Sequence, residues 1–238
     1  MSLAYPTVAS EQATLDLVLA GASLSRYGDG EITLAEGRSI VNQPRGDLSL
    51  SRRLRGILQG DGDPCLVGIP NIHSATPKAV FWAKYLERGA ALLNPSVSYG
   101  SSFISRPDSA PWIDTPDYWA ALETLWAGKD VTLVRGTPPA PHPKKPGRFT
   151  GGISILAEDL TTARSVTEVV GPGDDAWAVY DSLLEQVGTP TTALICLGPT
   201  ATVMAVDLCK RGVHAIDLGH VGTFMRQRQN RLQGKPVF

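Results

Sequence analysis

Cysteine is scarce in this chain, and its copies show neither metal-binding nor disulfide spacing. Of 238 residues, only Cys65, Cys196 and Cys209 carry a thiol, and no Cys-x-x-Cys pair occurs. An odd number of widely separated cysteines forms neither a disulfide framework nor a zinc site. Two lie in apolar runs typical of strands and the third in an expected helix, so we expect buried, reduced thiols.

The chain also lacks a strong net charge and a long apolar segment. Lys and Arg number 22 and Asp and Glu 23, so the net charge of −1 excludes an overall attraction to nucleic acid or anionic membranes. No apolar run approaches the length of a membrane span, and residues 1–11 lack the pattern of a signal peptide. We therefore expect a cytoplasmic protein without a membrane span.

What the chain does contain is an alternation of strand and helix patterns. Expected strands cover residues 65–69, 130–134, 165–170, 192–197 and 213–218. Expected helices cover residues 11–20, 32–36, 48–59, 77–88, 116–127, 175–187 and 200–211. This alternation predicts an α/β architecture. Because no internal repeat and no clear linker interrupts it, residues 1–238 are expected to form a single domain.

Two segments depart from this alternation. Residues 136–151 contain five prolines and no aliphatic residue larger than alanine, so they cannot enter a sheet interior. They form either an idle surface loop or a flap over a substrate site. Residues 221–238 are expected to be a basic C-terminal tail, either a solvated end or a contact for a phosphate-bearing partner. The basic residues of this tail are Arg226, Arg228, Arg231 and Lys235.

The most informative segment is residues 26–31, with the sequence Arg-Tyr-Gly-Asp-Gly-Glu. Asp29 and Glu31 each follow a glycine, so we expect both carboxylates on a glycine-flanked turn. Two carboxylates held close together repel each other unless they are solvated or a cation lies between them. Arg26 would offset part of this charge or hold a phosphate. The alternative is a solvated Asp-Gly turn.

A second site-like segment is residues 197–202, with the sequence Leu-Gly-Pro-Thr-Ala-Thr. An apolar strand ends at Gly198, and a helix is expected to begin with Thr200 or Thr202 within capping reach. The N–H groups of a helix start suit a phosphate oxygen. An ordinary strand-to-helix turn with a threonine cap is the alternative. The segment matches neither Gly-x-Gly-x-x-Gly nor a Walker loop.

Three further side chains are candidates because of their positions. Asp217 and His220 follow the last expected strand, and ligands in open α/β sheets collect at the carboxyl ends of strands. Both should therefore face the crevice next to Thr200, although His220 as a structural hydrogen-bonding group remains an alternative. Arg106 precedes a proline, which favours an extended backbone there. Its partner is expected to be a diphosphate or carboxylate, or else a surface salt bridge.

The remaining histidines and tryptophans are interpreted as structural. His73, His142 and His214 show no metal-ligand spacing, so we expect structural or solvated roles. Tryptophan falls mostly in expected helices, where core packing is its usual role.

Residues 26–31 and four later stretches resemble the bacterial glycosyltransferases of the GT-D type, formerly known as DUF1792. The four stretches are residues 66–70, 103–107, 197–203 and 215–220. They occur in the family's order and extend over most of the chain. In that family an Asp-x-Glu takes the place of the Asp-x-Asp of other metal-dependent glycosyltransferases. The resemblance implies a Rossmann-like fold, with a mostly parallel sheet flanked by helices.

The resemblance also implies an activity. A glycosyltransferase of this kind, expected here to be a hexosyltransferase, moves a sugar from a nucleoside diphosphate donor to an acceptor hydroxyl. A UDP-sugar is the expected donor, and a glycan, a glycoprotein or another molecule the acceptor. Mn²⁺ or Mg²⁺ held by Asp29 and Glu31 would neutralise charge on the leaving diphosphate. Asp217 or His220 is the expected general base.

The resemblance assigns the donor-binding residues as a group. They are Arg26, Gly28, Gly30, Arg106, Gly198, Pro199, Thr200 and Thr202. On the acceptor side the sequence departs from the family. Arg135, Gly136 and Thr137 stand where the family has Glu-Gly-Glu, and the usual acidic and aromatic ending after His220 is replaced. The acceptor or the base is therefore expected to differ from the family's.

Two other classes of function remain open. A metal-dependent phosphohydrolase of nucleotides or nucleotide sugars could use the same carboxylates and phosphate turn. A non-catalytic protein that binds nucleotide sugars would use them without turnover. A nucleic acid acceptor and a homo-oligomer also remain open.

Overall fold

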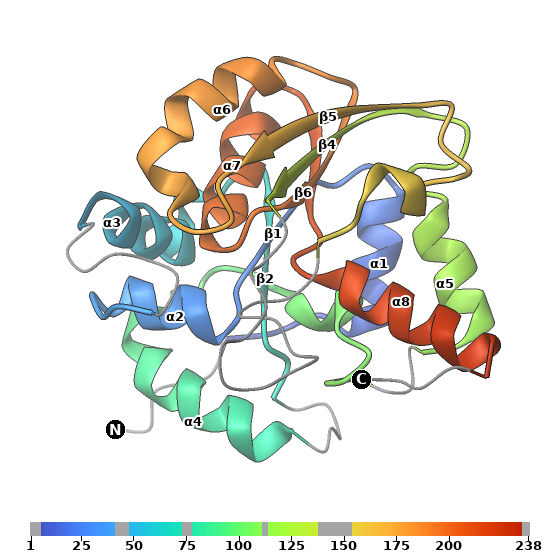
Figure 1. Ribbon diagram of the computed structural model, residues 1–238. Coiled ribbons are helices and arrows are strands. Elements are labelled where there is room, and N and C mark those ends of the chain that lie inside the picture. Colours follow the sequence, from blue (N-terminus) through green and yellow to red (C-terminus); the bar gives the residue numbers. More distant parts are fainter. Residues whose placement is uncertain (1–5, 41–47, 73–77, 111–113, 138–153, 235–238) are drawn as a thin grey trace, which may run out of the picture.

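A computed structural model describes residues 6–40, 48–72, 78–110, 114–137 and 154–234, and its strands form one sheet (Figure 1). The order across the sheet is β3-β2-β1-β7-β6-β4-β5, and every pair of neighbours is parallel. The strands are β1 (Leu24–Arg26), β2 (Leu66–Ile69), β3 (Gly100–Ser101), β4 (Asp130–Gly136), β5 (Ser165–Gly171), β6 (Thr192–Cys196) and β7 (His214–Asp217). The predicted α/β fold with a mostly parallel sheet is confirmed.

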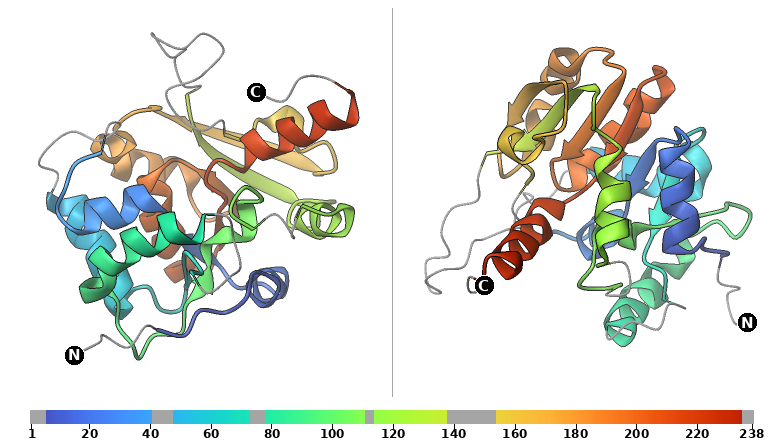
Figure 2. Two further views of the ribbon diagram at one scale, coloured as in Figure 1. Left: turned by 90° about the horizontal axis from the view of Figure 1, so that it is seen from below. Right: turned by 90° about the vertical axis from the view of Figure 1, so that its right-hand side faces the viewer.

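Helices cover both faces of the sheet. In Figure 1, α3, α6 and α7 lie on one side and α1, α5 and α8 on the other, and Figure 2 shows the same layers from two further directions. Helices α2 and α4 pack against each other, and in Figure 1 they lie at the left and the lower left, below α3. The helices are α1 (Glu11–Leu19), α2 (Asp29–Ala35), α3 (Leu48–Gly56), α4 (Ala79–Gly89), α5 (Pro116–Glu123), α6 (Tyr180–Val187), α7 (Pro199–Lys210) and α8 (Val221–Leu232).

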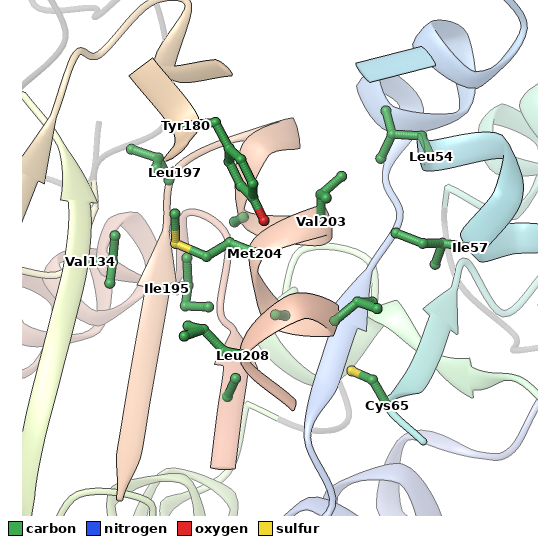
Figure 3. Packing of buried hydrophobic residues seen from close by; sticks show 14 of the residues in the cluster. Leu54, Ile57, Cys65, Val134, Tyr180, Ile195, Leu197, Val203, Met204 and Leu208 are labelled. Atoms are coloured by element: carbon green, nitrogen blue, oxygen red, sulfur yellow. The ribbon is translucent and has the colours of Figure 1, made fainter. Parts of the chain in front are cut away.

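The central strands are buried on both faces, which explains their continuous apolar runs. Along β6, Ala193 and Ile195 belong to the apolar cluster that contains the residues of α7, whereas Leu194 and Cys196 belong to the cluster on the opposite face. Figure 3 shows Met204 of α7 next to Ile195. The sheet is therefore the middle layer of three, with an apolar core on each side.

The chain changes direction across the sheet at β1. Strands β2 and β3 continue outward from β1 on one side, and the chain then crosses to β4 on the other side. Strands β1 and β7 are neighbours at this point, with Leu24 paired to Ile216. In open α/β sheets, ligands bind in the crevice outside the carboxyl ends of the strands at such a switch point. The topology therefore directs attention to the residues that follow β1, β6 and β7.

Several predicted elements are confirmed with their caps. Ser10 caps α1, its hydroxyl accepting a hydrogen bond from the Ala13 N–H, and Thr115 caps α5 through the Tyr118 N–H, with Pro116 in the first turn. The predicted helix over 48–59 is α3 followed by a π-helical turn at Ile57–Asp61. The predicted helix over 175–187 begins instead with a 3₁₀ turn at Ala176–Val179, before α6.

Residues 221–232 of the expected basic tail form helix α8, so this part is not a simple solvated end, and its contact with a phosphate-bearing partner stays a prediction. Val221, Gly222 and Phe224 bury one side of this helix. Strands β1 and β3 had no strand prediction, because three and two residues are too few to show a pattern. Among the described residues, no helix is both long and apolar enough to cross a bilayer. His73, His142, Lys235 and residues 138–151 of the Pro-rich segment lie outside the described residues.

Candidate functional site at the carboxyl edge of the sheet

Three neighbouring strands bring the predicted site residues together. Strand β1 ends at Arg26, β7 ends at Asp217, and β6 ends at Cys196, with Ile195 of β6 paired to Asp217. The segments that follow these strands begin α2, α8 and α7. The prediction that Asp217 lies close to the turn at Thr200–Thr202 is confirmed by a contact between Asp217 and Thr202.

Asp217 joins β1, β7 and α7 through its carboxylate. The Arg26 N–H donates to Oδ2 at 3.3 Å and the Gly219 N–H to Oδ1 at 2.9 Å. The Thr202 hydroxyl lies 3.3 Å from the same Oδ2 and 2.9 Å from the Arg26 carbonyl oxygen. Asp217 is only 3% exposed, and this burial raises its pKa to about 6 even though Arg26 and these donors favour the charged form. The Thr202 hydroxyl is therefore already hydrogen-bonded to other residues of the protein.

Arg26 is a buried cation whose donors are incompletely used. It is 7% exposed, and in the described part of the chain its Nε and Nη1 atoms have no hydrogen-bond partner. Burial lowers its pKa, although the charges of Asp217 and Glu31 oppose that effect. Gly219 has a φ of +56°, and a Cβ atom there would lie 2.6 Å from Arg26 Nη2. The glycine leaves room for the guanidinium group at the carboxyl edge of β1.

Asp29 and Glu31 lie in the first turn of α2, which begins at Asp29. The predicted arrangement, a turn followed by a helix from Ile32, was therefore wrong in its boundary. Glu31 Oε2 accepts a hydrogen bond from the Gly28 N–H at 2.8 Å, as in a capping box. Burial, with smaller contributions from the charges of Asp217 and Asp29, raises the pKa of Glu31 to about 7.

The residues present are compatible with a divalent cation, although they do not enclose one by themselves. Within the described ranges, no three His, Cys, Asp or Glu side chains are grouped as a cation site. Asp29 and Glu31 offer two carboxylates on one helix turn, and the raised pKa of Glu31 reflects uncompensated negative charge as well as burial. Mg²⁺ is commonly held by one or two carboxylates together with substrate phosphate oxygens.

The segment Gly198–Thr202 begins α7 differently from the prediction. The helix starts at Pro199, and the residue before it, Gly198, has a φ of +55° and makes no side-chain cap. The expectation of a threonine cap was therefore wrong. The Thr200 side chain is fully buried, and its hydroxyl has no partner among the described residues. Contact of this turn with a nucleotide stays a prediction.

Arg106 is held in a fixed position near the site. Its Nε and Nη2 donate to Asp108 at 2.8 and 3.0 Å, and Lys78 also bonds Asp108. Burial of Asp108 opposes ionisation, but these cations hold its pKa well below the usual range. The Arg106 guanidinium lies 5.5 Å from the Trp82 ring and 5.9 Å from the Phe224 ring. The alternative of a salt bridge is thus observed, in a partly buried form, and binding of a diphosphate by Arg106 stays a prediction.

His220 directly precedes α8, where its side chain makes no capping hydrogen bond, and its ring packs on Phe224, with 5.6 Å between ring centroids. Burial lowers its pKa to about 3, and the charges of Arg106 and Arg26 act in the same direction. The ring is therefore neutral at physiological pH and a weak base there. The roles of Asp217 and His220 in proton transfer stay predictions.

The arginines of α8 contact the body of the protein. Arg226 donates to the Ser154 carbonyl oxygen at 3.3 Å and to Asp159 at 3.1 Å, and Arg231 donates to Asp114 at 2.6 Å. These bonds occupy two of the four basic residues that had been expected in the tail. Arg228 lies over the Trp119 ring at 5.6 Å. His214 is structural, as predicted, with its Nε2 atom 3.2 Å from the Ala22 carbonyl oxygen.

Sequence reasoning missed three residues that contact the predicted site residues and so shape the site. Gly219 and Asp108 were not singled out, although each lies within two residues of a predicted site residue. Phe224 lies on a helix that was not predicted. A glycine directly after a strand and an acid two positions after Arg106 are the signals that were available for Gly219 and Asp108.

Comparison with known proteins gives consistent matches over most of the chain. The family model described as "Glycosyltransferase GT-D fold" matches residues 24–226. A solved structure described as a highly conserved domain of unknown function 1792 with a distinct glycosyltransferase fold is 30% identical, with a TM-score of 0.76. The match covers 97% of this chain and 83% of that one. A structure described as a new glycosyltransferase (DUF1792) from Streptococcus sanguinis is also 30% identical, with a TM-score of 0.75, covering 97% and 86%.

Two curated relatives are considerably longer than this chain. "Probable glycosyl transferase Gly" of Streptococcus gordonii is 30% identical over 90% of this chain and 32% of its own length. "Glycosyltransferase GlyD" of Streptococcus pneumoniae serotype 4 is 28% identical over 87% of this chain and 26% of its own length. This chain therefore spans about a third or less of either relative.

Proposed function

We propose, since this chain belongs to the glycosyltransferase GT-D fold family, that it transfers a sugar from a nucleoside diphosphate sugar to an acceptor hydroxyl. UDP-sugar is the donor that we propose, and a glycan or a glycoprotein the acceptor. We also propose that the reaction is assisted by Mn²⁺ or Mg²⁺ and that the transferred sugar is a hexose. A cytoplasmic location remains a prediction.

The observation that carries this proposal is the state of Arg26. Among the residues that the structure describes, the Nε and Nη1 atoms of this buried guanidinium have no partner, and such a group is costly to leave without a ligand. It lies where β1 ends, at the switch point of a parallel sheet, beside the first turn of α2. An anionic group supplied by a substrate would satisfy both donors and offset the burial of the charge. A diphosphate has the charge and the oxygen atoms to do so.

The two carboxylates suit a metal-bound diphosphate. Asp29 and Glu31 would hold the cation, and when bound it would neutralise charge that develops on the leaving diphosphate. Gly28 places its N–H against Glu31 and so orients that carboxylate. Asp217 holds the backbone of Arg26 through the Arg26 N–H, which positions the arginine relative to β7. The donor half of the site is therefore organised by side chains from β1, α2 and β7.

We propose that the acceptor half departs from the pattern that the resemblance to the family implies, because Arg135, Gly136 and Thr137 stand where that pattern has Glu-Gly-Glu. Arg135 at the end of β4 forms a two-point ion pair with Glu168 of β5, at 2.7 and 3.2 Å. The edge of the sheet that would carry two acids in the family thus carries a neutralised ion pair. We propose that the acceptor contacts this region without the acidic groups used by relatives.

The proposal is tested first by calorimetric titration with UDP, in the presence of Mn²⁺ and after chelation. We expect binding with Mn²⁺, and binding weakened at least about tenfold (~1.4 kcal/mol) by chelation, by Asp29→Asn with Glu31→Gln, and by Arg26→Lys. Lysine keeps the charge at position 26 but cannot donate through a planar fork.

Matched substitutions away from the site control for nonspecific effects. Asp117→Asn changes a carboxylate in the first turn of α5, and Arg164→Lys changes an exposed arginine paired with Asp130. Both controls should bind UDP as the unmodified protein does. Absence of binding to UDP and to other nucleoside diphosphates would refute the donor assignment. Hydrolysis of the nucleotide sugar at the same rate with and without acceptor would instead indicate a hydrolase, and a phosphohydrolase would release sugar phosphate in place of free sugar.

A further inference from the structure

The turn that follows β3 places a second arginine at the carboxyl edge of the sheet. Arg106 comes directly after the 3₁₀ turn Ser102–Ser105, which itself follows β3. The Arg106 carbonyl oxygen accepts hydrogen bonds from the Ser109 N–H at 2.8 Å and from the Ala110 N–H at 3.0 Å. The chain therefore turns back on itself here, and Asp108 comes to lie beside the Arg106 side chain.

Asp108 fixes one edge of the Arg106 guanidinium group. Arg106 Nε donates to Oδ1 at 2.8 Å and Nη2 donates to Oδ2 at 3.0 Å, which is the two-point geometry of an arginine–carboxylate pair. The Lys78 ammonium group, from the segment between β2 and α4, also bonds Oδ2. Two cations thus share one carboxylate, so the cluster of these three side chains keeps the positive charge that an anionic ligand requires.

Two aromatic rings restrict the remaining movement of the guanidinium group. Arg106 Cζ lies 5.5 Å from the centre of the Trp82 ring and 5.9 Å from that of Phe224, a range at which a ring attracts a cation. Trp82 is only 2% exposed, and its Nε1–H donates to the Ser109 hydroxyl at 3.2 Å. Arg106 is therefore ordered by the protein itself.

The Nη1 group of Arg106 remains available for a ligand. A guanidinium group can donate through Nε, Nη1 and Nη2. Within the part of the chain that the structure describes, the hydrogen bonds of the Arg106 side chain use Nε and Nη2 only. The side chain keeps 16% of its surface exposed. Asp108 therefore fixes one side of the group and leaves the other side free.

The segment 219–224 links Arg106 to Arg26. Gly219 lies against the Arg26 guanidinium group, because a Cβ atom at this glycine would be 2.6 Å from Arg26 Nη2. Phe224 lies next to the Arg106 guanidinium group, and the His220 ring packs on Phe224 at 5.6 Å. The two arginines, one at the end of β1 and the other after β3, therefore border the same short segment. A ligand that contacts both needs two anionic groups close together, as a diphosphate has.

We propose, as an extension that rests on the function proposed above, that Asp108 is a positioning residue for recognition of the donor diphosphate. Arg26 and Arg106 each bind one phosphate, and Asp108 holds Arg106 with its Nη1 group directed to the second of them. Asp108 itself contacts no phosphate, since like charges repel each other. Arg106 in this position makes the site select a nucleoside diphosphate over a monophosphate.

The test is a double-mutant cycle on UDP binding, measured by calorimetry with Mn²⁺. We expect Arg106→Gln to weaken UDP binding at least about tenfold, because a charge-assisted contact is lost. Asp108→Asn should weaken it about three- to tenfold, because binding must then order the Arg106 side chain. Added to Arg106→Gln, the same change should weaken binding by no more than about twofold, because a positioning residue acts only through the residue that it positions.

Binding of UMP separates the second phosphate from the rest of the nucleotide. Both single variants should lower the ratio of UDP affinity to UMP affinity at least about threefold. Asp130→Asn is the matched control, because it disrupts another two-point pair, with Arg164, on the exposed surface where β4 begins. This control should bind both nucleotides as the unmodified chain does. Circular dichroism and thermal unfolding check the fold, and Arg106→Lys takes the place of an unfolded Arg106→Gln, since lysine cannot pair at two points.

The outcomes separate this inference from the donor assignment. Absence of UDP binding by the unmodified chain would overturn both. If the unmodified chain binds UDP, equal or tighter binding by Asp108→Asn would overturn the role of Asp108 alone. An effect of Asp108→Asn that is undiminished in the Arg106→Gln background would also overturn it, as would an unchanged ratio of UDP to UMP affinity.

Discussion

At the scale of single residues, the candidate site is a set of charges that burial makes unfavourable. Arg26, Glu31 and Asp217 lie close enough to affect one another's pKa, and burial shifts each towards its neutral form. Such groups persist when surrounding structure over-determines them, and perturbed pKa values cluster at functional sites. The network around Asp217 supplies that structure here, because its three donors come from β1, from α7 and from the turn that follows β7.

Glu31 leads to a prediction about pH. Its pKa is about 7 in the folded protein and 4.5 ordinarily, so between these values the folded state holds a proton that the unfolded state has lost. The free energy of unfolding therefore falls as pH rises through this window, and above it the loss is complete. A Glu31→Gln variant has no proton to lose and still offers an oxygen to the Gly28 N–H.

Urea denaturation at pH 5, 6, 7 and 8 in the presence of a chelator measures this difference. Relative to the unmodified chain, Glu31→Gln should gain on the order of 1–3 kcal/mol as the pH rises from 5 to 8. Asp217 titrates in both proteins, so only the electrostatic coupling between Asp217 and Glu31 differs between them. Glu185→Gln, an exposed change on α6, serves as the control. A gap between the two proteins that does not vary with pH would contradict the assignment.

Gly219 leads to a prediction about binding. Gly219→Ala places a side chain at a φ of +56°, with its Cβ only 2.6 Å from Arg26 Nη2, so the guanidinium must move. Gly212→Ala is matched, because φ is +81° there and nothing lies within 4 Å of the added carbon. Both should lose about 1–2 kcal/mol of stability through the left-handed backbone. Calorimetry should find UDP binding weakened at least about tenfold in Gly219→Ala alone. Equal binding by the two variants would show that Arg26 does not contact the donor.

At the scale of elements, α8 was the largest feature that the sequence did not predict. Its sequence is basic, and after Val221, Phe224 and Met225 no apolar residue follows until Leu232, so the helical period is not sustained along the segment. The helix forms because the body of the protein supplies partners: Asp159 and Asp114 for two of its arginines, and Trp119 for a third. It also places Phe224 against Arg106 and His220. Docking of α8 therefore builds one wall of the site.

The docking of α8 can be tested at Gly222, where helix propensity and packing predict opposite results. Alanine is favoured over glycine inside a helix by roughly 1 kcal/mol. A Cβ at position 222 would, however, lie 2.4 Å from the Ser154 carbonyl oxygen and 2.7 Å from the Ile155 nitrogen. We expect Gly222→Ala to lower the free energy of unfolding by about 1–3 kcal/mol in chemical denaturation. Gln229→Ala, an exposed change on the same helix, should stay within about 0.5 kcal/mol. A Gly222→Ala protein more stable than the unmodified one would mean that α8 does not pack on this segment.

At the scale of the whole molecule, the two edges of the sheet have different roles. The carboxyl edge carries the charged candidate site, and the amino edge carries the turns that precede β4 and β6. Helix α7 connects the two edges, because it begins beside Asp217 and ends at Cys209 and Lys210.

This division predicts a pattern of hydrogen exchange. Addition of UDP and Mn²⁺ should slow amide exchange in residues 26–31, 198–202 and 217–222 at the carboxyl edge. Residues 127–130 and 188–191, which precede β4 and β6 at the amino edge, should exchange as before. Mass spectrometry of peptic fragments gives both regions in one experiment. Protection confined to the amino edge would place the ligand elsewhere.

Local patterns were sufficient to predict much of the fold. Ser10 and Thr115 cap their helices because a cap requires only a side chain and an N–H a few residues away. Buried strands such as β4 and β6 were visible because apolar burial on both faces produces an uninterrupted apolar run. Short elements such as β1 and β3 were not visible, since their pairing with neighbours, and not their own composition, makes them strands.

The sequence by itself determined the α/β class, most element positions and the residues 26–31 as the segment to examine. Only the tertiary structure decided that Arg26 is buried, that Thr202 bonds the protein, and that Asp217 ties three elements together. The bond between the Arg26 N–H and Asp217 joins residues 191 positions apart, and burial of a charge depends on everything packed around it. Neither this hydrogen bond nor the burial of the charge depends on neighbouring residues in the chain alone, so no local sequence pattern could have shown them.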